Sequence, residues 1–88
     1  MSQTTRELLR GVVRQASPLG SDVRFADDTP ILADGIIDSM GILGVMTEIE
    51  RALGVTLPPE ALVTENFQSI DTLAAMVDYA NLQRHDHI

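Results

Sequence analysis

Residues 37–54 read IDSMGILGVMTEIERALG and predict one complete helix together with both of its ends. Asp38 is a strong N-cap candidate, because its side-chain oxygen can accept a hydrogen bond from a free backbone N–H of the first turn. Gly54 stands where a glycine in the left-handed conformation ends many helices. The sequence therefore predicts a helix over residues 39–53.

Both faces of this predicted helix carry apolar residues. The face expected in the core holds Ile42, Val45, Met46, Ile49, Ala52 and Leu53. The opposite face holds Met40, Leu43 and Thr47, with Glu50 on one flank and Arg51 on the other. Two interpretations of this second face are open. Either the preceding loop folds over it, since scattered apolar surface residues are common, or it stays exposed and docks onto partner proteins.

Another helix is expected near the N-terminus. Thr4 and Glu7 have the spacing of a capping box, which places the start of the helix at Thr4. The helix should end before Pro18, because the residue preceding a proline disfavours helical geometry. Its apolar face comprises Leu8, Leu9, Val12, Val13 and Ala16. Beside that face runs a stripe of arginines spaced by four, which are Arg6, Arg10 and Arg14.

The last helix is expected after Ser69, a plausible N-cap. Its apolar residues follow helical spacing and are Ile70, Leu73, Ala74, Val77 and Ala80. Before it, Pro58 and Pro59 interrupt regular structure. Residues 64–67 predict one short helical turn, with Phe67 in the core. No segment predicts a convincing strand.

A long connection, residues 17–37, joins the first two predicted helices. Structureless loops longer than about 12–15 residues are uncommon in compact domains. This one carries apolar residues at intervals, which are Leu19, Val23, Phe25, Ile31, Leu32 and Ile36. We therefore expect the loop to be pinned across the helical core. The adjacent Asp27 and Asp28 are expected to be solvated.

Together these patterns predict an all-α protein, a four-helix bundle with three main helices, one short helix and a long first loop. Residues 1–88 are expected to form a single domain, because a chain of this length leaves no room for a second one. Within that domain the core is expected over residues 4–82. Residues 83–88 are expected to form a tail.

The composition excludes several function classes. The chain has 13 acidic residues against 6 basic ones and a formal net charge of -7, which argues against nucleic-acid binding. It has no cysteine, so a disulfide, a cysteine-based zinc site and a thiol nucleophile are excluded. The two histidines, His85 and His87, lie in the predicted tail and are poor candidates for activating a serine or fixing a metal. We therefore expect no enzymatic activity and no metal site.

The sequence also bears on location. The longest uncharged apolar run covers only residues 40–46, whereas a membrane span needs about 20 residues. The N-terminus lacks the apolar core of a secretory signal. We therefore expect a cytoplasmic protein with no membrane span, and a monomer. Its acid is concentrated after residue 24: residues 1–24 hold four arginines against two acidic residues, and the remainder holds two arginines against eleven.

Around Ser39 the chain resembles the modification motif of acyl and peptidyl carrier proteins, commonly written D/G-S-L. The matching segment is Asp34-Gly35-Ile36-Ile37-Asp38-Ser39-Met40. A long loop precedes the Asp-Ser pair, and a further family-like segment follows the helix as Gly54-Val55-Thr56-Leu57-Pro58. The similarity covers essentially residues 4–82.

This resemblance implies a discrete carrier protein without catalysis of its own. It implies that Ser39 carries 4′-phosphopantetheine, attached by a separate phosphopantetheinyl transferase that uses coenzyme A and magnesium, with Asp38 helping to present the site. The terminal thiol of the arm would hold an acyl or aminoacyl group as a thioester for downstream acyl-processing enzymes, as in type II fatty acid, polyketide or nonribosomal peptide biosynthesis. Partner enzymes would recognise Met40, Leu43 and Thr47, and acidic residues that include Glu48 and Glu50 would steer basic partners.

The chain departs from the family pattern at three positions. Met40 stands where leucine is usual, and Gly41 and Gly44 stand where many fatty-acid-type carriers have acidic residues. The segment Val63-Thr64-Glu65-Asn66-Phe67-Gln68-Ser69-Ile70 looks more like stand-alone carriers loaded by a separate AMP-forming ligase, such as the D-alanyl carrier group. The alternative hypothesis is a small unmodified helical interaction module that uses Met40 and Leu43 only to bind a partner.

Overall fold

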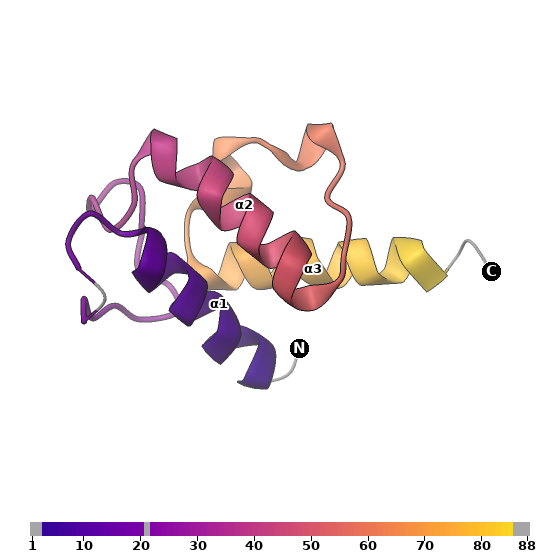
Figure 1. Cartoon of the computed structure of the whole chain (residues 1–88), viewed down its shortest axis with the longest axis horizontal. Coiled ribbons are helices and arrows are strands. Elements are labelled where there is room, and N and C mark those ends of the chain that lie inside the picture. Colours follow the sequence, from indigo (N-terminus) through magenta and orange to yellow (C-terminus); the bar gives the residue numbers. More distant parts are fainter. Residues whose placement is uncertain (1–2, 21, 86–88) are drawn as a thin grey trace.

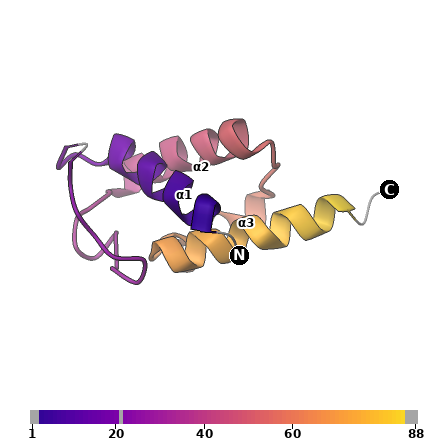
Figure 2. The same cartoon turned by 90° about the horizontal axis from the view of Figure 1, so that it is seen from below.

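The computed structural model describes residues 3–20 and 22–85. The chain forms helix α1 (Gln3–Ala16), helix α2 (Ser39–Leu53), the short 3-10 helices η1 (Pro59–Ala61) and η2 (Thr64–Phe67), and helix α3 (Ile70–His85). Helices α1 and α2 pack against each other, and α3 crosses beneath them and extends past both at its C-terminal end (Figures 1 and 2). The described residues contain no strand. The all-α bundle is thus confirmed, with η2 as the predicted short helix.

Helix α2 has the predicted bounds because both of its ends are fixed locally. The Asp38 backbone is extended, and its Oδ1 accepts a hydrogen bond from the Gly41 N–H at 2.8 Å. At the other end Gly54 adopts the left-handed conformation with φ of 66°, and its N–H donates to the Glu50 carbonyl at 3.0 Å. A residue with a Cβ would be strained at this φ, which explains the glycine.

The other two helices differ from their predictions at the ends. Helix α1 already includes Gln3, so Thr4 lies inside the helix and its predicted role as the capping residue is wrong. Ser69 does cap α3: its Oγ accepts from the Thr72 N–H at 3.2 Å, and Thr72 Oγ1 accepts from the Ser69 N–H at 3.0 Å. Helix α3 continues to residue 85, into the predicted tail, and residues 86–88 lie outside the described part.

The core lies where the three main helices meet. Phe67 is fully buried, as predicted. All the predicted core residues of α3 are buried as well, and they pack with buried residues of α1 and α2. The largest fully buried side chains are Phe67, Leu9, Ile31, Ile37, Ile49, Ile70, Leu73, Val13, Val45 and Val77. Ala52 was expected in this core but is exposed, because it lies in the final turn of α2 at the end of the bundle; Met46 and Leu53 are half-buried.

The long first loop is pinned across the core, as predicted. Ile31 and Ile36 are buried, and the Ile31 N–H donates to the Gln68 carbonyl at 2.8 Å. The Asp71 N–H donates to the Asp27 carbonyl at 3.0 Å, which ties the loop to the start of α3. Leu19 is an exception to the prediction, because it stays 58% exposed and does not help to pin the loop.

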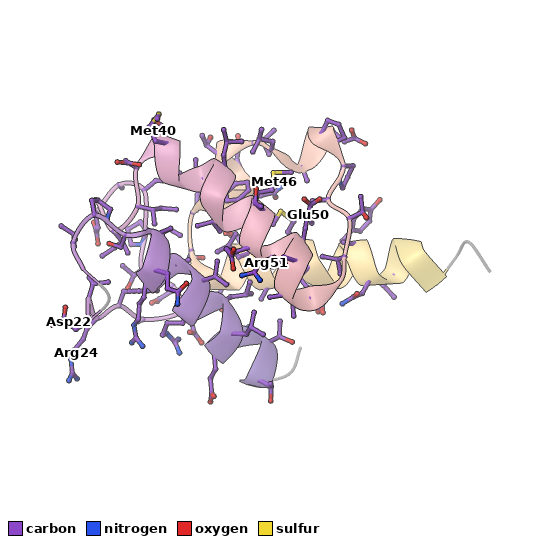
Figure 3. All side chains as sticks on the ribbon, viewed as in Figure 1. Asp22, Arg24, Met40, Met46, Glu50 and Arg51 are labelled. Carbon is purple, nitrogen blue, oxygen red and sulfur yellow. The ribbon has the colours of Figure 1, made fainter. Side chains whose placement is uncertain are left out.

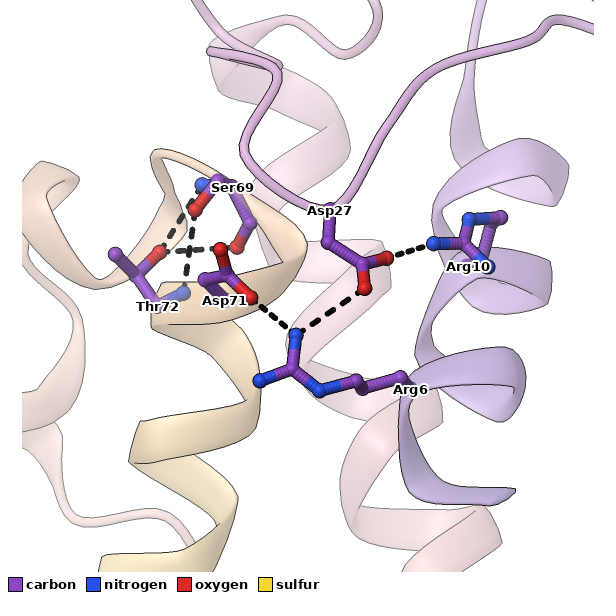
Figure 4. Close-up of polar contacts among 6 residues, drawn as sticks. All are labelled: Arg6, Arg10, Asp27, Ser69, Asp71 and Thr72. Atoms are coloured by element: carbon purple, nitrogen blue, oxygen red, sulfur yellow. Dashed lines mark hydrogen bonds and ion pairs between the residues drawn. The ribbon is translucent and has the colours of Figure 1, made fainter. Parts of the chain in front are cut away.

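Ion pairs also hold the same loop against α1. The carboxylate of Asp27 pairs with both Arg6 and Arg10, and Arg6 also pairs with Asp71 (Figure 4). The expectation that Asp27 is solvated is therefore wrong, because the arginine stripe of α1 faces the loop and meets its carboxylate. Arg14 completes the stripe, since its Nε donates to the Val23 carbonyl at 3.1 Å.

Candidate functional site

Ser39 is the first residue of α2, and its side chain is exposed. The preceding Asp38 supplies the cap to the Gly41 N–H, so the cap does not consume the serine hydroxyl. Among the described residues, the Ser39 hydroxyl has no hydrogen-bond partner. The local sequence therefore presents an unengaged nucleophilic oxygen at the positive end of a 15-residue helix.

The apolar strip that begins beside Ser39 is open. Met40 is 83% exposed and Leu43 is 60% exposed, and Met40 points away from the bundle (Figure 3). The first loop does not cover them, so the interpretation in which it folds over this face is wrong. Thr47 is also exposed, and its Oγ1 donates to the Leu43 carbonyl one turn earlier at 2.9 Å. The predicted recognition residues thus share one accessible face of α2.

The two acidic residues of α2 are already engaged within the molecule. Glu48 accepts from Arg51 at 2.7 Å and 3.2 Å, and this hydrogen bonding and the negative charge raise the pKa of the Arg51 guanidinium. Glu50 is half-buried, and its Oε2 accepts from the Leu57 N–H at 2.8 Å. The spacing of Glu48 and Arg51 could have revealed the first contact. No sequence signal reveals the second one, which joins α2 to the segment that follows it.

A shallow hollow of about 230 Å³ opens beside Ser39. Its walls come from α2 and from the segment around η2, and they are mainly apolar. The lining residues are Ser39, Ile42, Leu43, Leu62, Val63, Thr64 and Phe67. Sequence reasoning missed Leu62 and Val63, which remain 42% and 44% exposed between η1 and η2. The sequence signal available was two adjacent aliphatic residues between Pro59 and Phe67.

The chemistry of this end of α2 suits a phosphate ester. The positive end of a helix dipole and the N–H groups of its first turn favour an anionic group. Ser39 offers the oxygen to which a phosphate can be esterified, and the apolar hollow beside it offers a surface for the aliphatic part of an arm. The helix N-terminus, the Ser39 hydroxyl and the apolar hollow together therefore fit phosphopantetheine. Separately, the described residues contain no group of three or more side chains that could hold a metal ion.

Comparison with known protein families points the same way. Residues 7–80 match the family described as "Phosphopantetheine attachment site". The chain belongs to the phosphopantetheine carrier protein family. Carrier proteins of this family are not enzymes, and they bear 4′-phosphopantetheine covalently. The hypothesis of an unmodified interaction module is set aside by this match.

A relative agrees with the family. The carrier chain is 34% identical over 73 residues to Aminoacyl carrier protein 1 of Bradyrhizobium diazoefficiens, a match that covers 81% of this chain and 74% of the relative. The comparison with solved structures found no match. In the described part of the carrier, no helix is long and apolar enough to cross a membrane.

Proposed function

We propose that Ser39 is the attachment point of the phosphopantetheine arm and that the carrier holds an aminoacyl group on it as a thioester. The observation that carries this proposal is the exposed, unengaged hydroxyl of Ser39 at the N-terminus of α2, which Asp38 caps. The aminoacyl cargo is supported by the likeness to an aminoacyl carrier protein. Attachment makes a phosphodiester: the Ser39 oxygen gives up its proton to solvent or a base of the transferase and bonds to phosphorus, while the phosphoanhydride bond of coenzyme A breaks and adenosine 3′,5′-bisphosphate leaves.

The partners follow from this chemistry. A phosphopantetheinyl transferase supplies the arm from coenzyme A, and an AMP-forming ligase activates the cargo with ATP before it passes to the thiol. Downstream enzymes then take the group from the thioester. Coenzyme A and ATP are supplied in the cytoplasm, where we place the carrier, as a monomer that meets each enzyme in turn. The chain has no cysteine of its own, so the working thiol comes from the arm.

The test is the intact mass of the purified carrier after incubation with a broad-specificity phosphopantetheinyl transferase, magnesium and coenzyme A. We expect wild type to gain one phosphopantetheine and Ser39→Ala to gain none. A circular dichroism spectrum of the variant shows whether its fold is intact. Modification of Ser39→Ala, or no modification of wild type by several transferases, would contradict the proposal.

The cargo requires a second experiment on the modified carrier. The holo protein is incubated with ATP and a candidate AMP-forming ligase, against a panel of amino acids and fatty acids. We expect a mass gain that corresponds to an amino acid and is lost on treatment with neutral hydroxylamine, which cleaves thioesters. Loading only by fatty acids would overturn the aminoacyl assignment and leave the attachment at Ser39 standing.

A further inference from the structure

A second hollow, of about 590 Å³, adjoins the one beside Ser39. We call it the loop hollow, because it lies between the first loop and the segment around η2. Its lining residues are Asp28, Pro30, Leu32, Ala33, Thr64, Gln68 and Ser69. Thr64 also lines the hollow of about 230 Å³ that Ser39 lines, so the two hollows meet at the start of η2. An arm attached at Ser39 can therefore lie along the first hollow and enter the second.

Asp28 is the one charged residue among those that line these two hollows. It is exposed, and within the described part of the chain its carboxylate has no hydrogen-bond or ion-pair partner. The adjacent Asp27 is in the opposite situation, since it pairs with Arg6 and Arg10. The arginines of α1 thus neutralise the first carboxylate and leave the second one available to a cation.

The backbone around Asp28 is held in place by hydrogen bonds on both sides of it. The Thr29 N–H donates to the Ala26 carbonyl at 3.2 Å, and Thr29 Oγ1 accepts from the Ala26 N–H at 2.8 Å. These two bonds close a turn around Asp28, and the Ile31 N–H then ties the loop to the Gln68 carbonyl. The carboxylate is therefore positioned beside the loop hollow before any ligand arrives, which lowers the entropy cost of binding one.

An aminoacyl thioester brings a cation to this place. Its carboxyl group is consumed in the thioester bond, while its α-amino group remains and is largely protonated at neutral pH. An ammonium group donates charge-assisted hydrogen bonds to a carboxylate. The apolar residues of the loop hollow offer a surface for the rest of the cargo, namely Pro30, Leu32 and Ala33. A fatty acyl group has nothing to pair with Asp28, and a cargo that ends in a carboxylate is repelled by it.

We propose that the loop hollow is a resting site for the aminoacyl end of the arm, in which Asp28 binds the α-ammonium group of the cargo. This proposal rests on the proposed function, because it needs an aminoacyl group on an arm at Ser39. An exposed ion pair is weak, but tethering by the arm holds the ammonium group at an effective concentration in the millimolar range. The contact is therefore populated while the carrier is free, and it gives way easily when an enzyme takes the arm.

The test compares two cargoes that differ by one ammonium group, alanyl and propionyl. A broad-specificity transferase attaches them to Ser39 from coenzyme A analogues in which an amide replaces the thioester, so that the cargo is not lost by hydrolysis. The readout is the backbone amide shifts of Asp28, Leu32 and Ala33 in the nitrogen–proton NMR spectrum, relative to the carrier with an unloaded arm. We expect shifts at least about twofold larger for alanyl than for propionyl, because the ion pair raises the occupancy of the hollow by about that factor. Asp28→Asn should remove the difference.

The matched control is Asp22→Asn, which removes the same charge from the same loop. Asp22 is exposed, lines neither hollow and lies at the outer edge of the loop (Figure 3). This variant should keep the wild-type difference between the two cargoes. Equal shifts for alanyl and propionyl, including no shift for either, or a difference that survives in Asp28→Asn, would overturn the ammonium site. Failure to attach either cargo to Ser39 would instead contradict the proposed function.

Salt dependence gives an independent measurement on wild type. The difference between the alanyl and propionyl shifts should shrink as the salt concentration rises from about 0.05 M to about 0.5 M, because salt screens an exposed ion pair. The shifts that propionyl causes should change little, since salt strengthens apolar burial only slightly. A difference between the cargoes that is insensitive to salt would contradict the pairing with Asp28.

Discussion

Ser39 and Ser69 stand at the starts of two helices of the same domain, yet they are in opposite situations. Ser39 is the first residue inside α2 and is exposed, while Asp38 makes the cap. Ser69 precedes α3 and is itself the cap (Figure 4). It is only 7% exposed. A shift of one position relative to the helix start thus decides whether a serine holds a helix or is free for chemistry.

The two serines differ because α2 and α3 are capped by different side chains at their N-termini. In α2 the aspartate satisfies the N–H of Gly41, so the serine can follow it without a structural task. In α3 the serine and Thr72 satisfy each other's backbone N–H groups, and Thr72 Oγ1 also donates to the carbonyls of Ser69 and of Asn66 in η2. A modified Ser69 would lose this arrangement. The structure therefore distinguishes Ser39, which is exposed and has no structural task, from Ser69, which caps its helix.

The largest expected effect comes from exchanging each serine for alanine. Ser39→Ala should abolish the gain of phosphopantetheine and leave the free energy of unfolding within about 0.5 kcal/mol of wild type. Ser69→Ala should be modified completely but lose about 1 kcal/mol of stability, as caps generally do. Intact mass and urea unfolding measure the two quantities. The distinction between the serines would be wrong if Ser39→Ala were modified while Ser69→Ala was not, or if Ser39→Ala lost more stability than Ser69→Ala.

Phe67 lies close to both serines: it lines the hollow beside Ser39, and it precedes Ser69 by two residues. It is fully buried, so Phe67→Ala should lower the free energy of unfolding by about 3–5 kcal/mol. That loss is a large part of the roughly 5–15 kcal/mol by which native proteins are stable. Urea unfolding followed by circular dichroism is the measurement, with Phe67→Leu as the milder control. A loss below about 1 kcal/mol would show that Phe67 does not organise this end.

Asp38→Ala removes the cap that leaves Ser39 free. The variant should lose about 1 kcal/mol of stability, because the Gly41 N–H loses its acceptor. Asp38→Asn is the control, since asparagine caps about as well as aspartate. If Asn restores stability but not the rate of modification, the negative charge of Asp38 itself serves the transferase. If Asp38→Ala leaves the free energy of unfolding unchanged, the claim that Asp38 stabilises the start of α2 as its cap is wrong.

The smallest effect distinguishes two glycines in the first half of α2. Gly44→Ala should raise the free energy of unfolding by about 1 kcal/mol, since the new Cβ meets open space. Gly41→Ala should gain less, because its Cβ would lie 3.4 Å from Asp38 Oδ1 and 3.5 Å from the Ala16 carbonyl. Thermal unfolding of both variants measures the order. An equal gain would show that Gly41 does not mark the close approach of α1 to α2.

Features of the fold with local causes could be predicted from the sequence. The bounds of α2 follow from Asp38 and Gly54, and the start of α3 follows from Ser69, since each of these residues acts within one turn. Thr4 shows the limit of that reasoning, because a capping pattern can also lie inside a helix.

Contacts between distant segments could not be predicted in the same way. The pairing of Asp27 with Arg6 joins residues 21 positions apart. The carboxylate was expected to be solvated because Asp27 and Asp28 lie together in a loop with no sign of a cleft in the sequence. The bond from the Leu57 N–H to Glu50 depends on how the chain turns after α2. The same is true of the hollow that Leu62 and Val63 form beside Ser39. In the candidate site, therefore, sequence identified the residues of α2 and missed the opposite wall.

The central claim is that Ser39, and not Ser69, carries the arm. The chain has no lysine, so trypsin cleaves it only after arginine and places Ser39 in the peptide of residues 25–51 and Ser69 in that of residues 52–84. Peptide mass spectrometry of the enzymatically modified wild-type carrier therefore separates the two directly. The account predicts phosphopantetheine on Ser39 in the first peptide, and finding it in the second peptide would contradict the account.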